Sequence, residues 1–192
     1  MLQRLPLILR KQLKVSGAML ISIMVLSASL SPAATIPQNG DSIPSVHGTT
    51  FDDAKVDLPQ ALHGKVGIFV IGFSQDSREA VTTWGKKLAG DFYDSPTVAY
   101  YEMPVLASVP KLLRGFVEGR IKASVSDRGK PHFLPITENE TAWRSLVHYS
   151  DPNLPYILVV DEHGNVRWQA QGPPTDATYA TLKQQVDSLR PH

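Results

Sequence analysis

The stretch Val66–Glu79, VGIFVIGFSQDSRE, carries the pattern from which the fold is predicted. It begins with an uninterrupted apolar run, which is typical of a strand buried on both faces of a parallel or mixed sheet. Beyond it, apolar residues recur at helical spacing from Ser77 to Leu88. Asp76 and Glu79 are placed as a capping box, which predicts that the helix begins at this loop. A buried strand, a tight loop and a helix are therefore expected in succession.

The rest of the chain continues this alternation of strands and helices. Strands are predicted at residues 97–103, 132–137, 156–160 and 166–169, and amphipathic helices at 109–121 and 179–189. Trp143 and Trp168 are expected to pack in the core or against the last hairpin. This order predicts an α/β three-layer sandwich, in which a mixed central sheet is flanked by helices and interrupted by a helical insertion around residues 105–130.

Residues 1–34 are predicted to be a signal peptide or an uncleaved N-terminal anchor. Basic residues between Arg4 and Lys14 precede the uncharged run Val15–Leu30, and small residues follow it. A mitochondrial presequence is the alternative, because no acidic residue precedes Asp41. We therefore expect one domain over residues 35–192, exported to the periplasm or anchored facing it, with a mitochondrial location as the alternative.

Composition excludes two classes of function. Four of the 19 Lys and Arg residues lie in the first 34 positions and none of the 18 Asp and Glu residues do, which leaves 15 basic against 18 acidic residues. This balance argues against a nucleic-acid partner, which requires a basic face. The chain contains no cysteine, so thiol chemistry and structural disulfides are excluded.

Residues 64–189 resemble the thioredoxin-like superfamily. Gly64-Lys65-Val66 resembles the entry to the first buried strand of that superfamily, and Leu154–Asp161 with Gly164-Asn165-Val166 resembles its proline, strand and hairpin block. In that alignment Ser74–Ser77 stands where the family carries Cys-x-x-Cys. Pro155 matches the cis-proline that faces the active-site loop, which implies a cis Leu154–Pro155 bond.

A closer resemblance is to the thioredoxin-like assembly factors of mitochondrial ATP synthase and their bacterial relatives. It rests on Phe73-Ser74 before a helix with Trp84, on Met103-Pro104-Val105, and on the basic helical segment Pro110–Ser126. The block from Leu158 through Trp168 to Gly172 completes it. This resemblance implies a non-redox chaperone or assembly factor for a membrane complex.

Two surfaces are candidates for binding a protein partner. The first is a groove beside the Ser74 loop, for which the resemblance implies Phe73, Ser74, Gln75, Asp76, Ser77, Leu154 and Pro155. The competing interpretation is that Ser74, Asp76 and Ser77 only satisfy backbone N–H groups at the helix start. The second surface is a basic amphipathic helix with Lys111, Leu112, Arg114, Phe116 and Arg120. That helix can contact a partner or an anionic membrane surface, or its apolar face can simply cover the sheet.

No cofactor or metal is expected, because the six histidines form no metal-ligand motif. Ser74 lacks the Gly-x-Ser-x-Gly context of a hydrolase nucleophile. The alternatives to a binding protein are an enzyme that uses the same cleft without thiol chemistry and a degenerate relative of thiol-disulfide oxidoreductases or peroxiredoxins. An exposed apolar patch on the helix over 109–121 would favour the binding protein.

Overall fold

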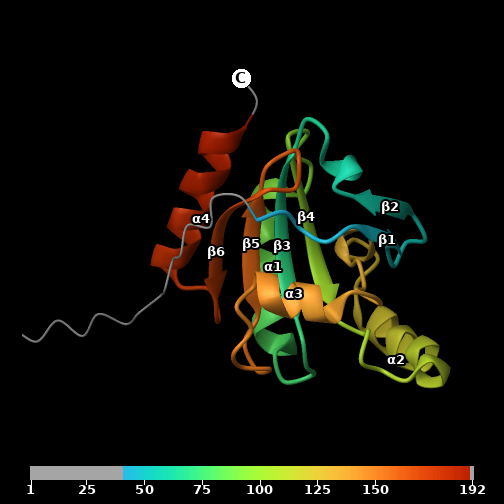
Figure 1. Cartoon of the computed structure of the whole chain (residues 1–192). Coiled ribbons are helices and arrows are strands. Elements are labelled where there is room, and N and C mark those ends of the chain that lie inside the picture. Colours follow the sequence, from blue (N-terminus) through green and yellow to red (C-terminus); the bar gives the residue numbers. More distant parts are fainter. Residues whose placement is uncertain (1–40, 191–192) are drawn as a thin grey trace, which may run out of the picture. The chain divides into compact units, whose positions relative to one another are not determined.

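The computed structural model describes residues 41–190, so the predicted signal peptide or anchor lies outside the described part. Four strands form one mixed sheet in the order β4-β3-β5-β6 (Figure 1). They are β3 (Val66–Gly72), β4 (Val98–Pro104), β5 (Tyr156–Val160) and β6 (Val166–Gln171). β3 runs parallel to β4 and antiparallel to β5, and β5 runs antiparallel to β6. The mixed sheet predicted from the sequence is confirmed.

The apolar runs form the two central strands because both of their faces are covered. Every residue of β3 and of β5 is buried. Alternate side chains point to opposite faces of the sheet, so Val66, Ile68 and Val70 enter one core while Phe69 and Ile71 enter the other.

Helices α1 (Arg78–Phe92) and α4 (Asp176–Leu189) cover the first face. α1 buries Trp84, whose indole N–H donates to the carbonyl of Gly172 at 2.9 Å. The N-terminus of α4 is capped by Thr175, whose hydroxyl accepts from the N–H of Thr178 at 3.0 Å. The chain forms β3, α1 and β4 in succession, and a connection between two adjacent parallel strands must cross over the sheet.

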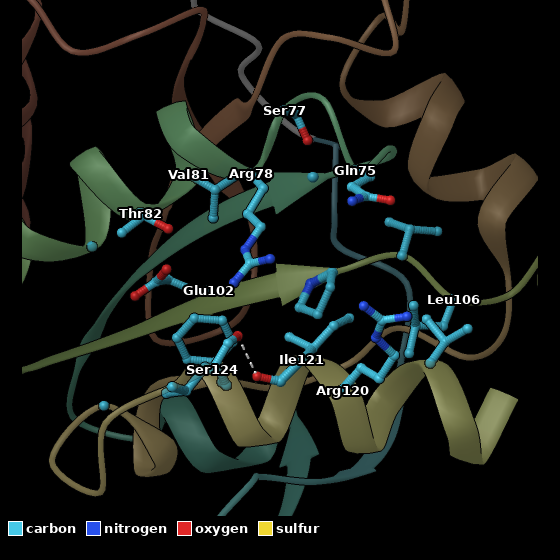
Figure 2. Close-up of a pocket in the computed structure, with 18 of the residues that line it drawn as sticks. Gln75, Ser77, Arg78, Val81, Thr82, Glu102, Leu106, Arg120, Ile121 and Ser124 are labelled. Atoms are coloured by element: carbon cyan, nitrogen blue, oxygen red, sulfur yellow. Dashed lines mark hydrogen bonds between the residues drawn. The ribbon is translucent and has the colours of Figure 1, made fainter.

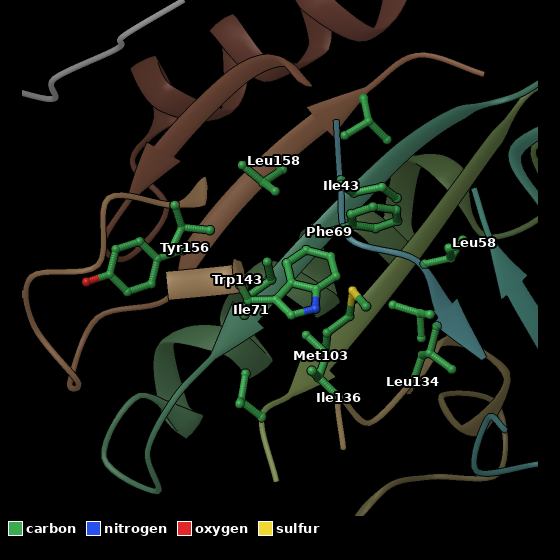
Figure 3. Packing of buried hydrophobic residues seen from close by; sticks show 14 of the residues in the cluster. Ile43, Leu58, Phe69, Ile71, Met103, Leu134, Ile136, Trp143, Tyr156 and Leu158 are labelled. Atoms are coloured by element: carbon green, nitrogen blue, oxygen red, sulfur yellow. The ribbon is translucent and has the colours of Figure 1, made fainter. Parts of the chain in front are cut away.

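Helix α3 (Glu140–Leu146) and a hairpin of β1 (Val46–Thr49) and β2 (Lys55–Leu58) cover the second face. Trp143 is fully buried there, and Figure 3 shows its indole ring among Ile71, Met103 and Tyr156. The short 3-10 helices η1 (Gln60–Leu62) and η2 (Lys130–His132) complete the elements of the described residues. Trp143 and Trp168 are both core residues, as predicted.

The strand predicted at residues 132–137 is wrong in detail. The segment runs beside the edge strand β4 but forms only isolated bridges, at Phe133 and at Ile136. Leu134 and Ile136 donate to the carbonyls of Glu102 and Pro104 at 3.0 and 2.9 Å. Pro104 of β4 has no N–H to donate in return, so the hydrogen bonds do not continue as a regular ladder.

The predicted helical insertion contains α2 (Lys111–Ser124), which follows the edge strand β4. None of its residues is buried, and Figure 1 shows it beyond the edge of the sheet. Within residues 41–190, no helix is both long and apolar enough to cross a membrane.

Candidate functional site

The loop between β3 and α1 is closed by a serine hydroxyl. Ser74 Oγ accepts from the N–H groups of Asp76 at 3.1 Å and Ser77 at 3.3 Å, and it donates to the carbonyl of Pro152 at 2.7 Å. Ser77 Oγ donates to the carbonyl of Ser74 at 2.9 Å. A hydroxyl offers one proton and two lone pairs, so the hydrogen-bonding capacity of Ser74 is fully used. Both serine protons point at backbone oxygens, and neither serine is activated by a base.

The capping box predicted at Asp76 and Glu79 is wrong. The N-cap of α1 is Ser77, whose side chain makes no capping hydrogen bond, and the helix begins at Arg78. The N–H groups of Asp76 and Ser77 instead donate to the hydroxyl of Ser74, which lies three residues before the N-cap. The loop therefore follows the serine-turn pattern, in which a hydroxyl bonds the backbone two or three residues further on.

The predicted cis bond between Leu154 and Pro155 is also wrong. Among the described residues the cis peptide bond is Leu58–Pro59. The hydrogen bond from Ser74 to this segment goes to the carbonyl of Pro152. The bend before β5 is held by Tyr156, whose hydroxyl accepts from the N–H groups of Ser150 and Asp151, both at 2.9 Å.

A cavity of about 800 Å³ lies between α1, β4 and α2. Figure 2 shows Arg78, Val81 and Thr82 of α1 on one side of it, Glu102 of β4 between, and Arg120 and Ile121 of α2 on the other side. The Ser74 loop forms one end of the cavity, and the segment after α2 forms another part of its wall. Such a mostly apolar cavity with a few polar groups is the usual form of a ligand-binding site. We call it the α1–α2 groove.

Glu102 is the buried polar group of the α1–α2 groove. Its side chain is 7% exposed, and its Oε2 atom has no hydrogen-bond partner in the described part of the chain. Burial raises the pKa of the Glu102 carboxyl to about 8, so it is largely protonated at neutral pH. A Cβ atom at Gly85 would collide with this carboxyl, so the glycine leaves room for Glu102 under α1.

The wall beyond Glu102 is built from aromatic and basic side chains. His132 stacks on Tyr100 with ring centroids 3.9 Å apart, and the guanidinium of Arg128 lies 4.0 Å from the ring centroid of Tyr93. Burial lowers the pKa of His132, which favours its neutral form. These contacts hold the segment after α2 against β4 and against the end of α1, and so fix this end of the groove.

The predicted partner helix is α2, and three of its large apolar side chains lie in solvent, whereas Val117 and Ile121 are half-buried and line the α1–α2 groove. Leu112 is 97% exposed, Leu113 55% and Phe116 66%. The interpretation that the apolar face covers the sheet is therefore wrong, because α2 follows the edge strand and none of its residues is buried. Lys111 and Arg120 are exposed, and the Arg120 guanidinium lies 5.8 Å from the Phe116 ring centroid.

The structure brings only some of the predicted site residues together. Phe73, Ser74, Gln75 and Ser77 line the same groove as Phe116 and Arg120 of the predicted partner helix. Asp76, Leu154 and Pro155 do not line it, and neither do Lys111, Leu112 and Arg114. Arg114 instead donates to the carbonyls of Ala107 at 3.1 Å and Val109 at 3.4 Å, which ties the start of α2 to the preceding loop. That these residues bind a partner stays a prediction.

Sequence reasoning missed Glu102 and Gly85. The available signals were one acidic residue within the otherwise uncharged strand 97–103 and one glycine in the middle of a predicted amphipathic helix. Neither signal identifies the other residue, because their contact depends on how α1 crosses β4.

The family model described as "ATP10 protein" matches residues 30–189. The chain belongs to the ATP10 protein family. This confirms the predicted resemblance, and solved structures confirm the thioredoxin-like fold. No curated protein matches the chain.

Three structural neighbours of this ATP10 family member illustrate the fold. BsSco, from the Sco family of cytochrome c oxidase assembly proteins, has 15% identity and a TM-score of 0.54, with 81% of this chain and 96% of BsSco covered. StoA from Bacillus subtilis has 18% identity and a TM-score of 0.51, with 76% and 98% covered. The thioredoxin domain of a thiol-disulfide oxidoreductase from Bacteroides vulgatus has 18% identity and a TM-score of 0.50, with 77% and 96% covered.

Proposed function

We propose that this ATP10 family member is a non-redox assembly factor that binds a protein partner during the assembly of ATP synthase. Membership of the family supports this role. The absence of cysteine removes the thiol chemistry for which the Ser74 loop is otherwise well placed. We expect the purified protein to show no insulin-disulfide reduction and no peroxidase turnover above a buffer blank.

The exposed apolar side chains of α2 are the observation that carries the proposal. Leu112, Leu113 and Phe116 are all more than half exposed on one helix, and Phe116 also lines the α1–α2 groove. Apolar surface of this kind next to a groove marks an interaction site more often than a chance exposure. The carboxyl of Glu102 is largely protonated and has no basic partner among the described residues, and neither Ser74 nor Ser77 is bonded to a base. These features favour binding over acid–base catalysis.

We further propose that the protein acts beside a membrane, on its exported side. The basic and apolar pattern of residues 1–34 supports an export signal or anchor. A mitochondrial location is the alternative for the same pattern. Fractionation of cells that produce the full chain distinguishes the two compartments.

Photocrosslinking in cells tests the proposed partner. The photoreactive amino acid benzoylphenylalanine replaces Leu112 in one variant of the full chain and Gln184, an exposed position on α4, in the matched control. We expect irradiation to crosslink the Leu112 position, and not the Gln184 position, to a subunit or assembly intermediate of ATP synthase.

Two results would contradict the proposal. One is a set of crosslinks at position 112 that contains no ATP synthase component. The other is equal labelling of the same subunit from positions 112 and 184, because this would indicate random encounter rather than binding through α2.

A further inference from the structure

The charges of the α1–α2 groove are the starting point for a more specific statement about the partner. Four basic side chains line it, namely Arg78, Lys86, Arg120 and Arg128, against the single carboxyl of Glu102. Because the carboxyl is buried and largely protonated at neutral pH, it does not neutralise these cations.

The basic side chains of the groove also lack acidic partners in the part of the chain that the structure describes. Among residues 41–190, no carboxylate forms an ion pair with Arg78, Lys86 or Arg120, whereas Lys87, Lys122 and Lys183 elsewhere on the surface all form ion pairs. The guanidinium groups of Arg120 and Arg128 lie over the aromatic rings of Phe116 and Tyr93. The groove therefore combines apolar walls with cations that no acidic side chain of the described domain balances.

Glu102 is an independent sign that the groove receives a ligand. Its side chain is more than nine-tenths buried, and its Oε2 atom has no partner among the described residues. Leaving a buried polar atom unpaired costs about 1–3 kcal/mol. Gly85 leaves space for this carboxyl at the base of the groove. Glu102 lines the groove, so its carboxyl lies beside the space that a ligand would enter.

We propose that the α1–α2 groove binds an acidic amphipathic segment of a protein partner, which places apolar side chains against Val81, Val117 and Ile121 and carboxylates against Arg78 and Arg120. Helix-in-groove recognition of this kind uses apolar anchors for affinity and charge for orientation. The inference rests on the proposed function, because it specifies the chemistry of the partner that α2 and its groove receive. It adds that the segment is acidic.

A pair of synthetic peptides tests the preference for acidic segments. Both peptides have about 16 residues, long enough for an amphipathic helix to form, and the same leucine face. One carries glutamates on the other face, and the second carries lysines in their place. Binding of each fluorescein-labelled peptide to the purified protein is followed by fluorescence anisotropy. We expect the acidic peptide to bind at least about ten-fold more tightly, and its affinity to fall with added salt.

Matched charge variants locate the site. Removal of two groove cations in R78Q/R120Q should weaken binding of the acidic peptide by about ten-fold. Removal of two exposed cations elsewhere, in K55Q/R167Q, should leave the affinity within about two-fold of wild type. Arg78 is at the N-terminus of α1, where a cation opposes the helix dipole, so its replacement is not expected to unfold the domain. Thermal melting of both double variants checks this.

Three outcomes would overturn the inference. They are equal affinity for the two peptides, equal losses in R78Q/R120Q and K55Q/R167Q, and binding to anionic lipid vesicles without binding to the acidic peptide. The last outcome would assign the cations to a membrane surface. Crosslinking of position 112 to ATP synthase together with any of these results would leave the proposed function standing and reject only the acidic segment.

Discussion

Helices α1 and α2 begin from similar sequence patterns and reach opposite environments. Each has apolar residues at helical spacing on one side and charged residues on the other. α1 buries Val81, Trp84, Gly85, Leu88 and Phe92, whereas α2 buries none of its residues. Amphipathic periodicity thus predicts that a helix has an apolar face, but it does not predict what covers that face.

The difference between the two helices follows from their places in the chain order. α1 connects β3 to β4, which are adjacent and parallel, so its path lies across the sheet. α2 leaves β4, which is at the edge of the sheet, and the chain then returns along the same edge through Phe133 and Ile136. Within residues 41–190 there is no strand beyond β4 for α2 to cover, which leaves Leu112, Leu113 and Phe116 available to a partner.

Replacing Trp84 of α1 with alanine should lower the stability of the domain more than any other substitution that we propose. Trp84 is fully buried and its indole N–H is bonded to the Gly172 carbonyl, so we expect the free energy of unfolding to fall by about 3–5 kcal/mol. Urea unfolding measures this change. The matched variant in α2, Phe116→Ala, should change stability by less than about 0.5 kcal/mol. Equal losses in the two variants would mean that α2 packs on the domain in solution.

Replacing Glu102, in the groove between the two helices, with glutamine should change how stability depends on pH. The folded-state pKa of about 8 is above the ordinary value of 4.5, so between these values the native state holds a proton that the unfolded state has released. The protonated carboxyl contributes its full stabilisation below pH 4.5, and this contribution is lost as the pH rises to about 8. Wild-type stability should therefore fall with pH by up to about 1.4 kcal/mol per unit from this group alone.

The Glu102→Gln variant has no titrating group at this position, so its stability should depend less steeply on pH. Urea unfolding at several pH values between about 5 and 8 measures the two slopes. Glu79→Gln, which removes an exposed carboxylate from α1, is the control and should keep the wild-type slope. Parallel slopes for wild type and Glu102→Gln would show that the carboxyl is solvated in solution.

The sheet could be predicted from sequence because its evidence is local. The apolar runs at residues 66–71 and 156–160 became β3 and β5, since strands covered on both faces need apolar residues throughout. The strand predicted at 132–137 was wrong in detail, because Pro104 on the neighbouring strand β4 has no N–H to donate and so interrupts the ladder between the two segments.

The candidate site was harder to predict because its residues meet only in the folded chain. The Ser74 loop was found from its place between a strand and a helix, but its actual hydrogen bonds reach Pro152, which is 78 residues away in sequence. The contact between Gly85 and Glu102 and the edge position of β4 are equally non-local. The sequence shows which residue types are present at these positions, but it does not show that the residues lie close together.

Replacing Ser74 with alanine should weaken the start of α1. The hydroxyl accepts from two N–H groups and donates to the Pro152 carbonyl, so its loss should cost about 1 kcal/mol, as for a helix cap. The control is Ser124→Ala at the end of α2, where the hydroxyl donates to the Ile121 carbonyl within the helix. It should change stability by less than about 0.5 kcal/mol. Equal losses of stability in Ser74→Ala and Ser124→Ala would contradict a special role of the Ser74 hydroxyl at the start of α1.

Replacing Leu112 with glutamine should have the smallest effect on stability. The side chain is 97% exposed, so a polar group of similar size loses no core contact, and the free energy of unfolding should stay within about 0.5 kcal/mol of wild type. The same substitution at Leu88, a buried position on α1, should cost at least about 2 kcal/mol. A measurable loss for Leu112→Gln in the purified protein would mean that this leucine is already covered there, by the protein itself or by a second copy. Leu112→Gln can also be combined with benzoylphenylalanine at the neighbouring Leu113. Unchanged stability together with loss of crosslinking from position 113 would show that Leu112 contacts the partner rather than the fold.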